Sequence, residues 1–124
     1  MLTPEQKSKL EPLTHHEKYG KILIEAMRSW ETTKPARRIF GIKFSYTWQL
    51  EPFSNQNCCL IGAALLYKKA NVNSYCESFV DNYLVSSHET ENLISGFDQS
   101  HSFSSSEAYD FGRQVSEIIF GEIH

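Results

Sequence analysis

The sequence predicts a mainly α-helical protein with a single domain, residues 1–124, in which about five helices pack around a buried helix at 58–69. Residues 58–67 contain no charged or strongly polar side chain, and several other segments repeat apolar residues at helical spacing. In one stretch, apolar and polar residues alternate strictly, so we expect one extended or hairpin β segment at 39–50. A length of 124 residues is typical of one domain.

The buried helix is predicted from its composition. Residues 58–67 read Cys-Cys-Leu-Ile-Gly-Ala-Ala-Leu-Leu-Tyr, with Asn57 before them and Lys68 after them. A helix that spans a bilayer needs about 20 apolar residues, so this run is too short. A short helix that is apolar on every side belongs in the interior of a globular protein. We therefore expect no membrane partner.

The first 30 residues predict two helices. Thr3 and Gln6 fit a capping box, and Pro12 keeps the first helix short. A second capping-box pattern, residues 14–17, precedes apolar residues at helical spacing, so we expect a helix over 15–30. These apolar residues are Tyr19, Ile22, Leu23, Ala26, Met27 and Trp30. Residues 31–38 then form a polar connector.

The alternating segment begins at Phe40 and ends at Leu50. Its backbone groups need hydrogen-bond partners, and no second strand of similar quality is visible in the sequence. Three structures satisfy the pattern: a hairpin that bends near Ser45, a strand paired with its copy in a homodimer, or an extended arm packed on the helices. Because an unpaired strand edge favours association, we expect a homodimer.

The second half predicts three further helices. Residues 75–84 carry apolar side chains on one face. Ser86 and Glu89 fit a capping box, which opens a helix whose end we expect Gly96 to loosen. Serines at 104–106 cap the last helix, and Gly121 suits the position just past its end.

Charge is distributed unevenly along the chain. Residues 1–70 contain 11 Lys and Arg against 6 Asp and Glu, whereas residues 71–124 contain 1 against 9. Either the two halves face and neutralise each other, or a basic surface binds an anionic partner. The candidate residues for such a partner are Lys34, Arg37, Arg38 and Lys43. We do not expect a nucleic acid, because the sequence has no recognisable nucleic-acid-binding pattern.

Cys58 and Cys59 are the candidate catalytic residues, because a thiolate at the start of a helix is stabilised by the helix dipole. This arrangement is similar to that of papain-like enzymes, with His101 or His88 as the base. The competing interpretation is that both cysteines are small buried residues. Adjacent His15 and His16 make poor joint metal ligands, so we expect neither a metal nor another cofactor.

The blocks at 58–66, 94–98 and 108–112 resemble a pattern in small uncharacterised bacterial and phage proteins. Those proteins read roughly Cys-Cys-x-x-Gly-Ala-x-Leu-Leu, then Gly-Phe-Asp, then Ala-Tyr-x-x-Gly. The resemblance covers the second half of the chain. It implies a mostly helical fold and nothing about chemistry.

The function that we expect is non-enzymatic: a binding or interaction protein that associates with itself through residues 39–50. Tyr46 and Trp48, together with Trp30, are candidates to line a ligand groove or a partner site, since aromatic residues concentrate in interface cores. The competing interpretation, which we favour for most of them, is that they fill the core. The alternatives are a cysteine-dependent hydrolase or transferase, and a binder of an anionic partner through residues 34–43. Three cysteines and no secretory signal lead us to expect a cytoplasmic protein.

Overall fold

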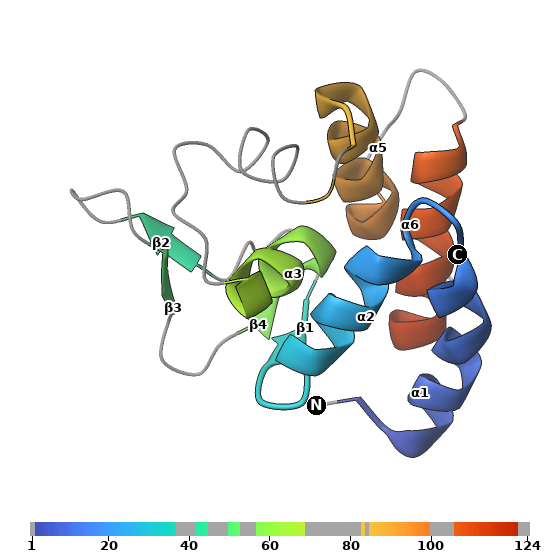
Figure 1. The fold of residues 1–124 in the computed structure, drawn as a ribbon. Helices are drawn as coiled ribbons and strands as arrows, with labels where there is room; N and C mark the ends of the chain where they lie inside the picture. Colours follow the sequence, from blue (N-terminus) through green and yellow to red (C-terminus); the bar gives the residue numbers. More distant parts are fainter. Residues whose placement is uncertain are drawn as a thin grey trace.

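The computed structural model describes residues 2–36, 42–44, 50–52, 57–68, 83, 85–99 and 106–121. The described chain is mainly helical, as the sequence predicts (Figure 1). Its helices are α1 (Pro4–Leu10), the short 3-10 helix η1 (Glu11–His15), α2 (Gly20–Ser29), α3 (Leu60–Lys68), α5 (Ser87–Asp98) and α6 (Glu107–Phe120).

Four short strands form two small sheets in the described chain. Strand β1 (Lys34–Pro35) pairs in parallel with β4 (Asn57–Cys58), and β2 (Ile42–Phe44) pairs antiparallel with β3 (Leu50–Pro52). The β1–β4 pair was not predicted, because two residues are too few to show an alternating pattern and the partners are far apart in sequence.

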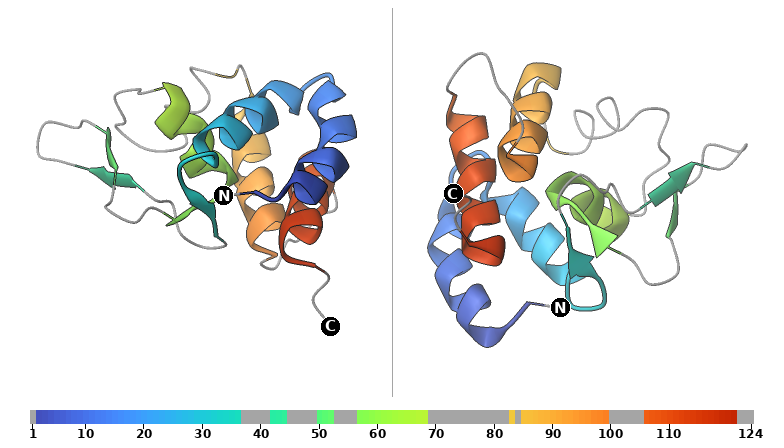
Figure 2. Two further views of the ribbon diagram at one scale, coloured as in Figure 1. Left: turned by 90° about the horizontal axis from the view of Figure 1, so that it is seen from below. Right: turned by 180° about the vertical axis from the view of Figure 1, so that it is seen from behind.

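The β2–β3 pair shows which of the three expected structures the alternating segment adopts. Its register sets Ile42 opposite Pro52 and Phe44 opposite Leu50. The segment is therefore a hairpin, one of the three expected structures, and its second strand extends to residue 52. Both views in Figure 2 place this pair beyond α3, on the side away from α5 and α6.

Two helix pairs make the most extensive contacts, α5 with α6 and α2 with α3. Helix α1 packs on α6, and η1 packs on α2, so the N-terminal segment ties the two pairs together. Helix α3 is buried on every side from Leu60 to Leu65, which confirms that a buried helix lies here. The predicted start at Cys58 is wrong, because Cys58 belongs to β4 and the helix begins at Leu60. Its principal described neighbours are α2 and α5.

Three predicted helix starts are confirmed by their caps. Thr3 with Gln6 and Ser86 with Glu89 form complete capping boxes at α1 and α5. The oxygen of Ser106 accepts a hydrogen bond from the backbone N–H of Tyr109 at the start of α6. At the end of α6, Gly121 adopts the positive φ of 81° that favours glycine.

The predicted start of the second helix is wrong. Helix α2 begins at Gly20, not at His15, which belongs to η1. The Thr14 hydroxyl donates to the carbonyl of Glu11 instead of capping a helix. Tyr19 is the N-cap residue of α2 and makes no side-chain cap hydrogen bond. His16 Nδ1 instead accepts from the backbone N–H groups of Lys18 and Tyr19 just before the helix, both at 3.2 Å.

Gly96 has a packing role that the sequence analysis does not predict. Helix α5 continues to Asp98, and Gly96 is buried in its last turn. A side-chain carbon at Gly96 would collide with the carbonyl of Tyr109, and one at Gly112 with the carbonyl of Leu93. The two glycines therefore allow α5 and α6 to approach each other closely. The predicted helix at 75–84 lies outside the described residues, except for Tyr83.

Candidate functional site

Of the predicted binding residues, Lys34 and Lys43 lie in the described part of the chain. Lys34 is exposed on β1, and Lys43 is described only as part of the β2 backbone. Arg37, Arg38, Tyr46, Trp48 and His101 lie outside the described residues. Trp30 is fully buried and stacks on Phe97 with 6.0 Å between ring centroids, so its expected place in a partner site is wrong.

Cys59 is placed directly before α3, with 5% of its surface exposed. Its Sγ accepts a hydrogen bond of 3.4 Å from the backbone N–H of Gly62, which gives the thiol the geometry of a helix cap. Cys58 belongs to β4, and only its backbone is described. The described geometry of Cys59 fits the buried-residue interpretation.

Two of the three described histidines, His15 and His16, lie beside carboxylates. His15 Nε2 lies 2.7 Å from Glu11 Oε1, and His88 is exposed in the first turn of α5. His16 Nε2 lies 2.9 Å from Glu107 Oε1. Among the described residues, no group of three His, Cys, Asp or Glu side chains is arranged to hold a metal ion.

His16 belongs to an aromatic cluster that joins η1 and α2 to α5 and α6. Its ring stacks on Tyr19 at 4.9 Å and meets the edge of Phe111 at 5.1 Å. The Tyr19 hydroxyl donates a 2.6 Å hydrogen bond to Glu89, which completes the capping box of α5 with Ser86. Because Nδ1 accepts from two backbone N–H groups, the neutral ring carries its proton on Nε2, toward Glu107.

The pKa values of this cluster follow from its burial and hydrogen bonding. Burial and the carboxylate of Glu89 raise the pKa of Tyr19. The hydrogen bond from Tyr19, aided by the bonds with Ser86, lowers the pKa of Glu89. Tyr19 therefore contacts the start of α5 through the ionised carboxylate of Glu89.

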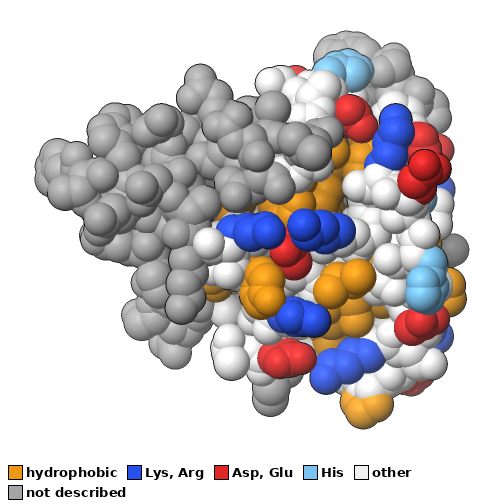
Figure 3. Space-filling model, viewed as in Figure 1, with side chains coloured by type: hydrophobic (Ala, Val, Ile, Leu, Met, Phe, Trp, Pro, Cys, Tyr) orange, Lys and Arg blue, Asp and Glu red, His pale blue; other side chains and the backbone are white. Residues whose placement is uncertain are grey.

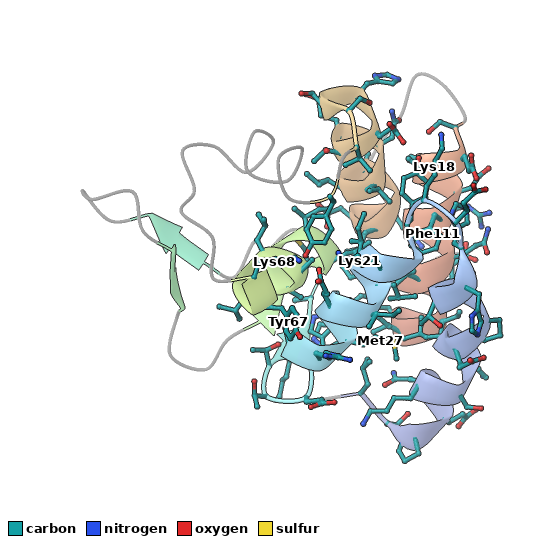
Figure 4. All side chains as sticks on the ribbon, viewed as in Figure 1. Lys18, Lys21, Met27, Tyr67, Lys68 and Phe111 are labelled. Carbon is teal, nitrogen blue, oxygen red and sulfur yellow. The ribbon has the colours of Figure 1, made fainter. Side chains whose placement is uncertain are left out.

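A surface that the sequence analysis missed lies across α2 and α3. We call it the α2–α3 surface and define it by Lys21, Ile24, Glu25, Arg28, Tyr67 and Lys68. The four residues of α2 follow the spacing i, i+3, i+4, i+7 and so share one helical face. Figure 4 shows Lys21, Tyr67 and Lys68 together on one side of the molecule, and Figure 3 shows basic and apolar side chains interspersed there.

One acidic side chain contributes to this surface. Glu25 is only 6% exposed, and its Oε1 lies 3.0 Å from Lys68 Nζ. The Lys68 ammonium also lies 5.6 Å from the ring centroid of Tyr83. Burial, together with the nearby Glu25 carboxylate, raises the pKa of Tyr83, whose hydroxyl donates to the carbonyl of Ala64 at 3.0 Å. One oxygen of the Glu25 carboxylate is thus already paired with Lys68.

The exposed part of the surface is basic and apolar. Arg28 Nη1 donates a 2.9 Å hydrogen bond to the hydroxyl of Tyr67, and its guanidinium lies 5.6 Å from the centroid of that ring. Tyr67 and Ile24 remain 40% and 38% exposed. Within the described part of the chain, no carboxylate lies within ion-pair distance of Lys21 or Arg28.

A second feature is an open groove of about 480 Å³ between the N-terminal helices and α6. Its lining includes Lys9, Leu13, Glu117 and Ile118. The nearby Arg113 pairs with Glu117 at 2.8 Å, so the carboxylate in the groove already has a partner.

No protein-family model, curated protein or solved structure matches this chain. In the part of the chain that the structure describes, no helix has the length and apolar character needed to cross a membrane.

Proposed function

We propose that this chain is a non-enzymatic interaction protein that associates with a second copy through the β2–β3 hairpin. One observation carries the proposal: β2 and β3 pair only with each other among the described strands. Each strand therefore has an outer edge that no other described strand occupies, and in this proposal its backbone groups pair with a strand of the second copy. Strand addition at such an edge is a common mode of protein association.

The position of the hairpin supports this proposal. The pair lies beyond α3 and away from the α5–α6 pair in each view (Figures 1 and 2). Its most extensive contacts are internal to the pair. Two copies related by a twofold axis can then join equivalent edges in a closed dimer.

Size-exclusion chromatography with light scattering tests the proposal. We expect the wild-type chain to elute at twice the 14.3 kDa of one copy. Phe44→Lys places a charge in β2 at a position where the alternating pattern requires an apolar residue, so we expect a monomer. Lys43→Gln changes the neighbouring polar position and should leave the dimer intact.

The helical fold provides the internal control for these variants. Because the hairpin lies apart from the α5–α6 pair, the helical circular dichroism signal should be the same in wild type, Phe44→Lys and Lys43→Gln. A monomeric wild type, or a Phe44→Lys variant that remains dimeric with its helices intact, would contradict the proposal.

A further inference from the structure

We propose that the α2–α3 surface is a docking site for an acidic segment of a partner protein, one in which carboxylates flank apolar side chains. This inference goes beyond self-association, because it involves α2 and α3 and not the β2–β3 hairpin. It stands on three properties of the surface: its charge, its exposed apolar side chains and the way its cations are held.

The charge of the surface is opposite to that of the whole molecule. The chain carries a net charge of -3, yet the cations of this surface, Lys21, Arg28 and Lys68, outnumber its one acid, Glu25, and leave it with a positive balance of two. The acid among them, Glu25, is buried and paired with Lys68. An approaching partner therefore meets positive charge, which favours an acidic one.

The apolar side chains distinguish the class of acidic partner. Ile24 and Tyr67 are two of the three large apolar side chains that are exposed among the described residues. A small inorganic anion would leave both of them in water. A protein segment with leucine or phenylalanine between its carboxylates would cover them and would also satisfy the cations.

The cations are held in place before any partner arrives. Arg28 is fixed by the Tyr67 hydroxyl, and Lys68 is fixed between Glu25 and the ring of Tyr83. Because these long side chains are already held in place, less side-chain entropy is lost when a partner binds. Arginine also offers a planar fork of donors that matches a carboxylate.

The test measures binding of a defined probe to the full-length chain by fluorescence anisotropy. The probe is a labelled helical peptide in which glutamates flank a stripe of leucines, and its counterpart carries glutamine in place of every glutamate. We expect the glutamate peptide to bind more tightly than the glutamine peptide, and its binding to weaken as salt is added.

Matched double charge reversals then locate the site. Lys21→Glu with Arg28→Glu reverses two cations of the α2–α3 surface, and Lys7→Glu with Lys9→Glu reverses two exposed cations of α1. Both pairs change the net charge equally. We expect the first pair to weaken binding about tenfold or more, since it replaces attraction by repulsion, and the second pair to have a much smaller effect.

Several results would overturn the proposal. One is equal affinity of the wild type for the glutamate and glutamine peptides. Another is an equal loss of affinity for the glutamate peptide in the two double variants. The third is tighter binding of the wild type to single-stranded DNA or to phosphatidylserine vesicles than to the glutamate peptide. If the surface variant fails to fold, acetylation of the wild type decides: the glutamate peptide should protect Lys21 and Lys68 but not Lys7, and lack of such protection contradicts the site. Phe44→Lys should bind the peptide normally, which separates this test from that of self-association.

Discussion

The thiol of Cys59 illustrates how burial decides the chemistry of a single residue. A cysteine at the start of a helix is favourably placed to become a thiolate. Here the sulfur accepts the backbone N–H of Gly62 and is 5% exposed, so reagents have little access to it. A reactive thiol needs both a position at the start of a helix and access from solvent. Cys59 has the position but little access.

We predict that Cys59 reacts slowly with iodoacetamide in the folded protein and rapidly once the chain is unfolded. Mass spectrometry of alkylated peptides over a range of pH, with each cysteine followed separately, measures the rates. Rapid alkylation of Cys59 in the native state, near neutral pH or below, would contradict this prediction. It would favour a cysteine-dependent hydrolase or transferase over the proposed interaction protein.

The hydrogen bond from Tyr19 to Glu89 predicts a pH dependence of stability. The pKa of Glu89 is lowered from its ordinary value of 4.5 in the folded state. Its contribution to stability is therefore fully present above pH 4.5 and is lost as the pH falls through the folded pKa. We predict that Tyr19→Phe reduces this acid-dependent loss, because the hydrogen bond from Tyr19 is the principal cause of the shift.

Urea unfolding at several pH values between neutral and strongly acidic measures this effect. Tyr109→Phe is the comparison, since Tyr109 is not among the causes of the Glu89 shift. If Tyr19→Phe and wild type lose stability in parallel as the pH falls, the assigned role of Tyr19 is incorrect.

At the scale of elements, the two buried glycines set the distance between α5 and α6. We predict that Gly112→Ala destabilises the fold by about 1–3 kcal/mol, because the added methyl group meets the carbonyl of Leu93 and the backbone must shift. Gln114→Ala, at an exposed position of the same helix, should change stability by no more than about 0.5 kcal/mol. Thermal or urea unfolding compares the two variants, and equal stability would show that the helices are not in close contact at Gly112.

Local signals allowed several elements to be predicted from sequence. The caps at Thr3, Ser86 and Ser106 and the stop at Gly121 depend on residues within one turn of each helix end. The start of α2 was mispredicted because the Thr14 hydroxyl bonds back to the carbonyl of Glu11, and the imidazole of His16 accepts the backbone N–H groups of the turn that precedes Gly20.

Tertiary contacts set the limit of such prediction. The role of Gly96 depends on a helix that begins 11 residues later in the sequence, at Glu107. The α2–α3 surface joins residues 21–28 to residues 67–68, and nothing in either segment reveals the other. The helical spacing of Lys21, Ile24, Glu25 and Arg28 was visible in the sequence, and it is the one signal that pointed to half of the surface.

At the scale of the whole molecule, two different surfaces serve two proposed interactions. The β2–β3 hairpin offers strand edges to a second copy, and the α2–α3 surface offers cations and apolar side chains to an acidic segment. Association through backbone edges depends little on ionic strength, whereas docking on exposed cations weakens with salt. Added salt should therefore release the acidic peptide and leave the dimer intact.

Hydrogen–deuterium exchange at several protein concentrations tests self-association through the hairpin most directly. Pairing between copies predicts that the amides of residues 42–44 and 50–52 become more protected as the concentration rises, while those of α5 and α6 do not change. Protection of the two strands that is independent of concentration would contradict the proposed dimer.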